Sequence, residues 1–307
     1  IPSDFSTIIN ALQTPTDGSQ SKLTLIDFSL DFSPSGVFGF WSVITGFVLL
    51  NIAAFGMDQD VTQRMLTCKD SKEATKALTS SIIMGIPVVL IFVIIGMLLY
   101  IYYQRPDLMS QSVANGDAPT PEFVGQTVTI FMYYVLTDLP NGIKAVVTIG
   151  IIAAALSTLN SGLNSMSSVA VQDIYRGILL KNGKTLSETH MVKAGRISMI
   201  IVAIALSLMA ALCFYWQQLS VMIFSYSGLL GVYFTALFSK RGSPFSILAA
   251  LIIGFLIPVL MQPYIMSLYL PVEYQFSLGF SWQLMIATFV ATSVCLLGNT
   301  NAIKDKM

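Results

Sequence analysis

Residues 78–103 read LTSSIIMGIPVVLIFVIIGMLLYIYY, an apolar stretch without a charged side chain. The hydrocarbon core of a bilayer is about 30 Å thick, and a helix crosses it with about 20 apolar residues. This stretch is therefore long enough to span a membrane. Of the 307 residues in the chain, 54% are hydrophobic and 10% are charged, whereas about 25% are charged in an ordinary soluble domain. The composition indicates an all-α integral membrane protein and excludes a soluble enzyme.

Further windows of spanning length lie on both sides of this stretch, and we expect seven membrane helices in all. The third window carries many Ser and Asn residues in its second half, yet it keeps an unbroken helical spacing. The predicted spans are roughly Gly36–Met57, Leu78–Tyr103, Gly142–Tyr175, Ile197–Tyr215, Leu219–Phe238, Pro244–Met261 and Trp282–Leu297.

The basic residues sort to one side of these spans. Lys and Arg favour the cytoplasmic face of short loops. Thirteen of the 16 basic residues fall in segments 58–77, 176–196, 240–241 and 304–306, which alternate to the same side. This predicts a multi-pass protein of the plasma (inner) membrane, with the residue 1 side outside and the residue 307 side cytoplasmic. The 16 acidic residues balance the basic ones, so nothing favours a nucleic-acid partner.

The start of the chain gives a further expectation. The chain begins at Ile1, and the polar opening segment lacks the basic start and apolar run of a signal peptide. We therefore expect a piece of a longer protein. The three cysteines are an odd number beside apolar stretches and indicate no disulfide framework. An amphipathic piece near Phe123–Tyr134 is predicted to lie at the membrane interface.

A stripe of polar side chains marks the third predicted span, where residues 153–168 read AAALSTLNSGLNSMSS. At about 100° per residue, the hydroxyls and amides fall on one face about 140° wide. An unpaired polar group in hydrocarbon costs several kcal/mol, so this face must meet another helix, water or an ion. The members of the stripe are Ser157, Asn160, Ser161, Asn164, Ser165 and Ser168.

Two interpretations of the stripe remain open. Small and amide-bearing residues let two helices pack closely and hydrogen-bond to each other. Alternatively, the oxygens hold a cation, since hard cations prefer oxygen ligands and unwound carbonyls coordinate Na⁺ in transporters. No acidic or basic residue lies well inside the predicted spans, which argues against a proton relay. If an ion binds on the stripe, sodium fits better than a proton.

Two segments resemble the sodium:solute symporter family, which includes the sodium/glucose, proline, iodide and sialic acid symporters. Residues 51–66, NIAAFGMDQDVTQRML, followed by KEA at 72–74, are similar to the end of the family's sixth core helix and the loop after it. The stripe and its continuation QDIY at 172–175 are similar to the eighth core helix. The resemblance covers nearly the whole chain and looks closest to bacterial sodium/sialic acid and sodium/sugar symporters.

The resemblance implies a fold of two inverted five-helix repeats, the five-plus-five transporter type, with solute and ions bound between the repeats. The chain then covers the second repeat plus two trailing helices. Residues 1–35 are expected to form an extracellular or periplasmic segment, 36–238 the second repeat, and 239–307 the two additional helices and the cytoplasmic end.

The same resemblance assigns the site residues. The carbonyl of Ala154 and the hydroxyls of Ser157 and Thr158 match the family's main sodium site. Asn160 and Ser161 match a second sodium site of some members, although Asn160 departs from the Ser or Thr found there.

Solute-binding residues are also implied. Asn51 matches a sugar-contacting Asn, with an interhelical hydrogen bond as the alternative role. Phe55 matches an aromatic gate, with packing as the alternative. Gly85 stands where some sugar transporters carry a Lys, so their specificity does not transfer.

The activity implied is sodium-coupled secondary active symport, in which Na⁺ drives import of a small organic solute such as a sugar or sialic acid by alternating access. The partners are then the solute, the sodium ion and the bilayer. An alternative is a membrane sensor domain that binds ion or solute without transport. We expect no enzyme, because the one histidine, His190, lies outside the predicted spans and leaves the intramembrane serines without a base.

Overall fold

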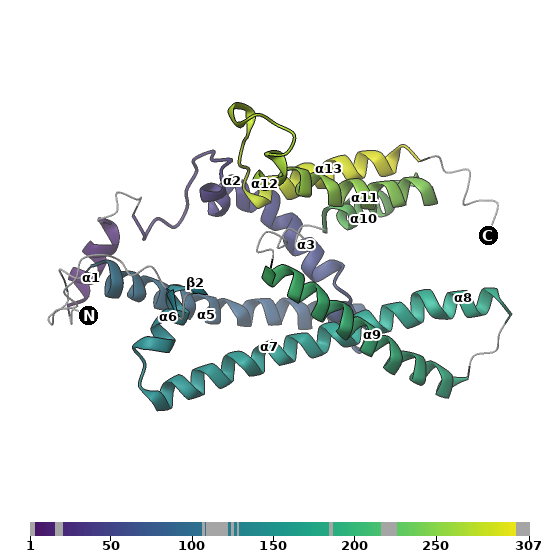
Figure 1. The fold of residues 1–307 in the computed structure, drawn as a ribbon, viewed down its shortest axis with the longest axis horizontal. Coiled ribbons are helices and arrows are strands. Elements are labelled where there is room, and N and C mark those ends of the chain that lie inside the picture. The colour runs from purple at the N-terminus through teal and green to yellow at the C-terminus, as the bar shows by residue number, and fades with distance from the viewer. Residues whose placement is uncertain are drawn as a thin grey trace. The chain divides into compact units, whose positions relative to one another are not determined.

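The computed structural model describes residues 4–15, 21–105, 108, 122–123, 126–127, 129–183, 187–215 and 226–298. This part of the chain is helical apart from one antiparallel pair of short strands, β1 (Glu122–Phe123) and β2 (Gln126–Thr127) (Figure 1). The chain divides into two compact units, which are described separately. The first comprises Ile1–Leu25 and Met65–Gly162, and the second comprises Ile26–Arg64 and Leu163–Met307.

The first unit is built on the long helix α5 (Ser71–Gln104). Its start is fixed by Asp70, whose side chain accepts a hydrogen bond from the backbone N–H of Glu73 at 2.8 Å. Around α5 lie α1 (Phe5–Gln13), α6 (Ile130–Thr137) and the first part of α7 (Asn141–Val169).

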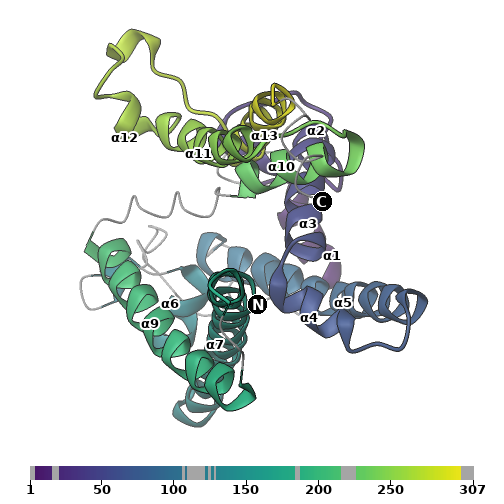
Figure 2. The ribbon, with the colours of Figure 1, turned by 90° about the vertical axis from the view of Figure 1, so that its right-hand side faces the viewer.

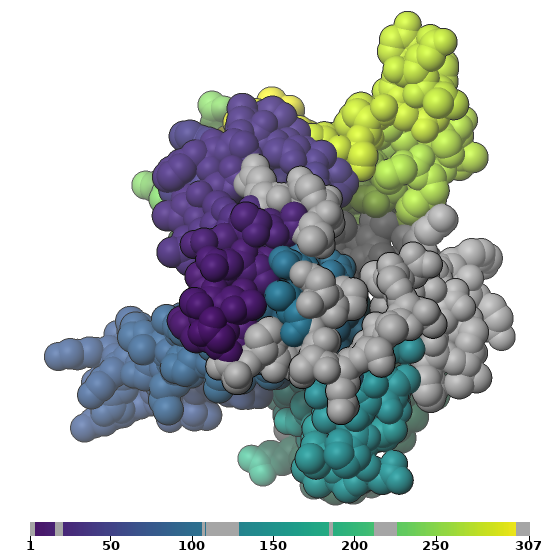
Figure 3. All heavy atoms as spheres, turned by 90° about the vertical axis from the view of Figure 1, so that its left-hand side faces the viewer, coloured from purple at the N-terminus to yellow at the C-terminus, as the bar shows by residue number. Residues whose placement is uncertain are grey.

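Contacts at the C-terminal end of α5 hold α1 in place. The guanidinium of Arg105 donates to the carbonyls of Ala11 and Thr14, both at 3.4 Å. The ammonium of Lys22 lies 5.1 Å from the centre of the Tyr100 ring, a distance at which a cation is attracted to the ring face. In Figure 3, α1 in dark purple lies beside the blue end of α5.

The second unit contains the remaining helices. Its first helix is continuous from Phe40 to Gly56 and includes a π-helical turn, η2 (Val43–Phe47). The end of α7 likewise continues through the π-helical turn η4 (Ala170–Tyr175). The elements of this unit are η1 (Pro34–Phe38), α2 (Phe40–Ser42), η2, α3 (Val48–Gly56), α4 (Gln59–Leu66), the end of α7, η4, α8 (Arg176–Lys181), α9 (Glu188–Tyr215), α10 (Tyr226–Phe238), α11 (Pro244–Leu260), α12 (Pro263–Met266), η6 (Val272–Tyr274) and α13 (Phe280–Leu296).

Small side chains line the contacts among α10, α11 and α13, which pack side by side in the second unit (Figures 1 and 2). Residues four apart on a helix share one face, so small residues at that spacing let the backbones of membrane helices approach closely. Such series of buried residues are Ser227, Gly231 and Thr235 on α10, Ser246, Ala250, Gly254 and Pro258 on α11, and Ala287, Ala291 and Cys295 on α13.

Apolar helices lie at the positions of the predicted windows, but fewer than seven of the described helices pass a test for spanning length. Three described helices are long and apolar enough to cross a membrane: Ser71–Gln104, Asn141–Lys181 and Glu188–Ala211. The pair Phe40–Gly56 and Gln59–Leu66 passes the same test when taken together, with a bend of 50° between its members. Three shorter apolar helices, α10, α11 and α13, match the last three windows. Residues 219–225 of the fifth window lie outside the described part of the chain.

Two loops are shorter than predicted. The segment after the third span stays helical through α8 as far as Lys181, and α9 already begins at Glu188. His190 therefore lies in the first turn of a helix, and its Nε2 is 3.0 Å from the hydroxyl of Tyr175. The segment 58–77 also contains a helix, α4. Periodicity within the apolar windows could not reveal these helical ends, because they extend into polar sequence.

The amphipathic piece predicted near Phe123–Tyr134 is only partly helical. Phe123 belongs to β1, and the helix of this region, α6, runs over Ile130–Thr137. Residues 124, 125 and 128 of this piece lie outside the described part of the chain.

Candidate functional site

The predicted sodium ligands lie near the middle of the membrane span of α7. Lys144 is the last charged residue before a run without charge that extends to Asp173. A hydrocarbon core of about 30 Å corresponds to about 20 helical residues, which carries the span from Ala145 to about Asn164. Ala154 lies midway between these two residues.

Backbone and hydroxyl oxygens pair along this part of α7. The Thr158 hydroxyl donates to the carbonyl of Ala154 at 3.1 Å. The Ser161 hydroxyl donates to the carbonyls of Ser157 at 3.2 Å and of Thr158 at 3.4 Å. Such bonds to the preceding turn bring a hydroxyl next to a carbonyl on the helix surface. Two of the three predicted main ligands, Ala154 and Thr158, therefore present their oxygens side by side.

The remaining predicted ligands are placed on the same helix. The side chains of Ser157 and Asn160 make no hydrogen bond to any other residue that the structure describes. Both are exposed, as are all residues from 151 to 160. No described helix covers the oxygens at the centre of the stripe.

The C-terminal end of the stripe is more covered than its centre, since Ser165 is buried and Ser168 is half-buried. Ser165 and Ser167 are buried, and the Ser167 hydroxyl donates to the carbonyl of Gly195 at 2.9 Å. Ser167 lies beside the stripe and not on it, so this bond shows that α7 and α9 approach each other here, while both interpretations of the stripe itself remain predictions.

The electrostatics of the central part follow from the absence of charge between Lys144 and Asp173 in the sequence. α7 would therefore contribute carbonyl and hydroxyl dipoles, and no charged side chain, to a bound cation here. Hard cations take such oxygen ligands, and unwound backbone carbonyls serve this purpose at the sodium sites of transporters. The donor set fits a singly charged, hard cation such as Na⁺.

Asn51 and Phe55 lie on α3 in the second unit. The Asn51 amide donates to the carbonyl of Phe47, in the π-helical turn of its own helix, at 2.8 Å. This bond lies within one helix, and both the interhelical role and the solute-binding role of Asn51 remain predictions. Phe55 is half-buried. π-Helical turns occur frequently at functional sites.

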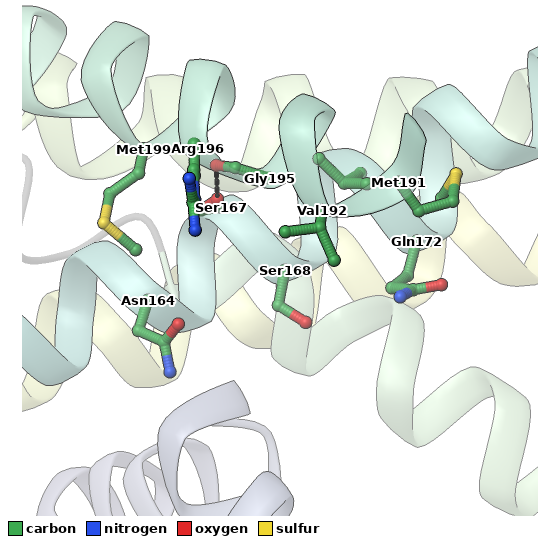
Figure 4. A pocket seen from close by; sticks show the side chains of 10 residues that line it. Asn164, Ser167, Ser168, Gln172, Met191, Val192, Gly195, Arg196 and Met199 are labelled. Atoms are coloured by element: carbon green, nitrogen blue, oxygen red, sulfur yellow. Dashed lines mark hydrogen bonds between the residues drawn. The ribbon is translucent and has the colours of Figure 1, made fainter. Parts of the chain in front are cut away.

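A pocket of about 340 Å³ between α7–η4 and α9 was missed by sequence reasoning (Figure 4). It lies wholly within the second unit. A signal for it was present in Arg196, which directly precedes the apolar run that begins at Ile197. The pocket is lined by Asn164, Ser167, Ser168, Val171, Gln172, Met191, Val192, Gly195, Arg196 and Met199.

Known proteins resemble this chain in sequence. The sodium:solute symporter family model matches residues 11–254. The sodium/sialic acid symporter SiaT of Proteus mirabilis is 27% identical over 220 residues, which are 69% of this chain and 41% of the relative. The sodium/glucose cotransporter of Vibrio parahaemolyticus is 28% identical over 205 residues, 65% of this chain and 37% of the relative.

A solved structure shares the fold. It is the substrate-bound outward-open state of a Na⁺-coupled sialic acid symporter, with a TM-score of 0.64 and 23% identity. The match covers 88% of this chain and 51% of that one, so the chain spans about half or less of the proteins it matches. Because the family model matches well over half of the chain, the chain belongs to the sodium:solute symporter family.

Proposed function

We propose that the protein containing this chain is a sodium-coupled symporter that imports a small organic solute, a sugar, a sialic acid or a similar compound, by alternating access. The observation that carries the proposal is the adjacent pair of neutral oxygens, from Ala154 and Thr158, at the middle of an uncharged membrane helix. The relatives are named as symporters and a cotransporter, which gives no support to the sensor alternative.

Coupling follows from differential binding. Na⁺ at Ala154, Ser157 and Thr158 stabilises the conformation that accepts solute from outside, provided that the ion binds that conformation more tightly than the other. Each positive charge that moves inward through 100 mV releases about 2.3 kcal/mol. This free energy, added to that of the sodium gradient, concentrates the solute in the cell.

The proposed architecture is a pair of inverted repeats of which this chain forms the second, followed by two trailing helices. The matched symporter fold supports the proposed architecture, and the sorting of basic residues supports the proposed orientation.

Cys68 lies between α4 and α5 on the side proposed to be cytoplasmic. A membrane-impermeant maleimide should label it in inside-out vesicles only, with Cys68→Ser as the control; labelling from outside would reverse the orientation.

The solute site is proposed to include Asn51, with Phe55 as a gate. A second sodium site is proposed at Asn160 and Ser161. Asn51→Ala should raise the solute concentration for half-maximal uptake without changing the sodium dependence. If the variant lowers only the amount of folded protein, the bond from Asn51 to Phe47 serves the helix alone.

Uptake into proteoliposomes tests the transport proposal. The full-length protein is reconstituted, and uptake of labelled sialic acid and labelled glucose is followed with an inward sodium gradient. Replacing Na⁺ by choline or K⁺ should abolish accumulation of the transported solute, because no other ion then supplies the driving force. Accumulation that persists in choline would refute sodium coupling. Binding of a solute without accumulation in any condition would support the sensor alternative.

A further inference from the structure

The pocket between α7–η4 and α9 lies where the hydrocarbon core ends. On α7, counting about 20 residues from Ala145 reaches Asn164, which lines the pocket. On α9, the apolar run begins at Ile197, directly after Arg196. Two helices thus independently place this pocket at the depth of the lipid headgroups.

The pocket is lined by both apolar and polar side chains, as expected for a lipid site at headgroup depth. Figure 4 shows Arg196 and Met199 near Asn164 at one end of the pocket, and Gln172 near Met191 at the other. The thioether and methyl groups suit acyl chains, while the guanidinium and amides suit a polar headgroup. A phospholipid presents this combination at the boundary of the hydrocarbon core.

The polar groups of the pocket include several hydrogen-bond donors. Arg196 is exposed and forms no ion pair with any residue in the described part of the chain. The side-chain oxygen of Gln172 accepts from Arg176 at 3.5 Å, which leaves the amide nitrogen as a donor. In Figure 4 this nitrogen lies on the side of Gln172 nearer to Ser168. Donors around one positive charge favour an anion.

Other charges near the pocket do not reverse this preference. Acidic residues nearby in the chain are Asp173, next to Gln172, and Glu188, before Met191, and neither lines the pocket. Basic residues nearby are Arg176 and Lys193. Arg196 is the sole charged residue in the lining.

We propose that this pocket binds the headgroup of an anionic phospholipid, with Arg196 as the main ligand of its phosphate group and Ser168 as a neutral donor. Gln172, at the other end of the pocket, contacts the remainder of the headgroup. Ser167 is not a ligand, because its hydroxyl is bonded to the Gly195 carbonyl and holds the two walls together. The proposal goes beyond solute transport, because the pocket lies further along α7 than the predicted sodium ligands. Lipid binding to it can be measured in an experiment that does not depend on uptake.

Lipid binding to the purified full-length protein tests the proposal. Native mass spectrometry in detergent is used to titrate phosphatidylglycerol, with phosphatidylcholine as the zwitterionic comparison. Arg196→Gln should weaken phosphatidylglycerol binding at one site by about tenfold, the usual effect of losing a charge-assisted contact to phosphate. Lys193→Gln removes an equal charge from the same helix, at a residue that does not line the pocket. It should change the affinity of that site for phosphatidylglycerol by no more than about twofold.

Further arms separate the sources of phosphate. Gln172→Leu should weaken the same site without a change in net charge, and it keeps the test informative if Arg196→Gln folds poorly. Competition by inorganic phosphate that depends on Arg196 would support the phosphate chemistry with a soluble source. The proposal is overturned if Arg196→Gln and Lys193→Gln weaken phosphatidylglycerol equally, or if neither lipid nor inorganic phosphate binding depends on Arg196.

Discussion

Thr158→Val is expected to raise the sodium concentration for half-maximal uptake by about tenfold or more, which corresponds to about 1.4 kcal/mol. Valine has nearly the shape of threonine but lacks the hydroxyl that lies 3.1 Å from the Ala154 carbonyl. The cation would therefore lose one of its oxygen ligands while the helix surface keeps its shape. The measurement is the sodium dependence of uptake at saturating solute.

The same helix supplies a matched control. Thr148 makes the same type of bond, to the Lys144 carbonyl at 2.8 Å, but lies nearer the end of the span. Thr148→Val should leave the sodium dependence unchanged. Ser157→Ala should shift it in the same direction as Thr158→Val. Equal shifts for Thr148→Val and Thr158→Val would show that the hydroxyl acts on helix stability and not on the ion.

Gly254→Ala is expected to destabilise the second unit by about 1–3 kcal/mol, the usual range for overpacking. A Cβ atom at Gly254 would lie 2.4 Å from the Cα of Gly228 and 2.5 Å from its backbone nitrogen. Both obstacles are backbone atoms, so α10 and α11 would have to move apart. The measurement is the midpoint of thermal unfolding and the yield of monodisperse protein in detergent.

Gly96 on α5 provides the opposite case. Nothing lies within 4 Å of a Cβ placed there, and alanine favours a helix over glycine by about 0.5–1 kcal/mol. Gly96→Ala should therefore leave the midpoint unchanged or raise it. If both variants unfold at the same temperature as the original protein, the close approach of α10 and α11 does not contribute to stability.

The positions of the apolar helices could be predicted from windows of about the length that a bilayer requires. α13 follows its window closely, whereas α5 and α9 begin earlier, in polar sequence. The π-helical turns at Val43–Phe47 and Ala170–Tyr175 could not be predicted, since hydropathy does not distinguish one helical hydrogen-bond pattern from another. They matter because one of them carries the acceptor for Asn51.

The candidate site was only partly predictable. The stripe on α7 followed from helical periodicity, and the Ala154–Thr158 pair follows from the reach of a threonine hydroxyl to the preceding turn. The bond from Ser167 to the Gly195 carbonyl, beside the stripe, depends on how α7 and α9 approach each other in space. The pocket beside Arg196 depends on the same approach of α7 and α9, which cannot be predicted from a local sequence pattern.

A density map of the full-length protein, at a resolution that shows ions and compared in Na⁺ and in choline, tests the sodium site directly. The account predicts a peak in Na⁺ alone, within coordinating distance of the Ala154 carbonyl, the Thr158 hydroxyl and the Ser157 hydroxyl. A map in Na⁺ in which these three oxygens face a tightly packed neighbouring helix, with no peak between them, would contradict it.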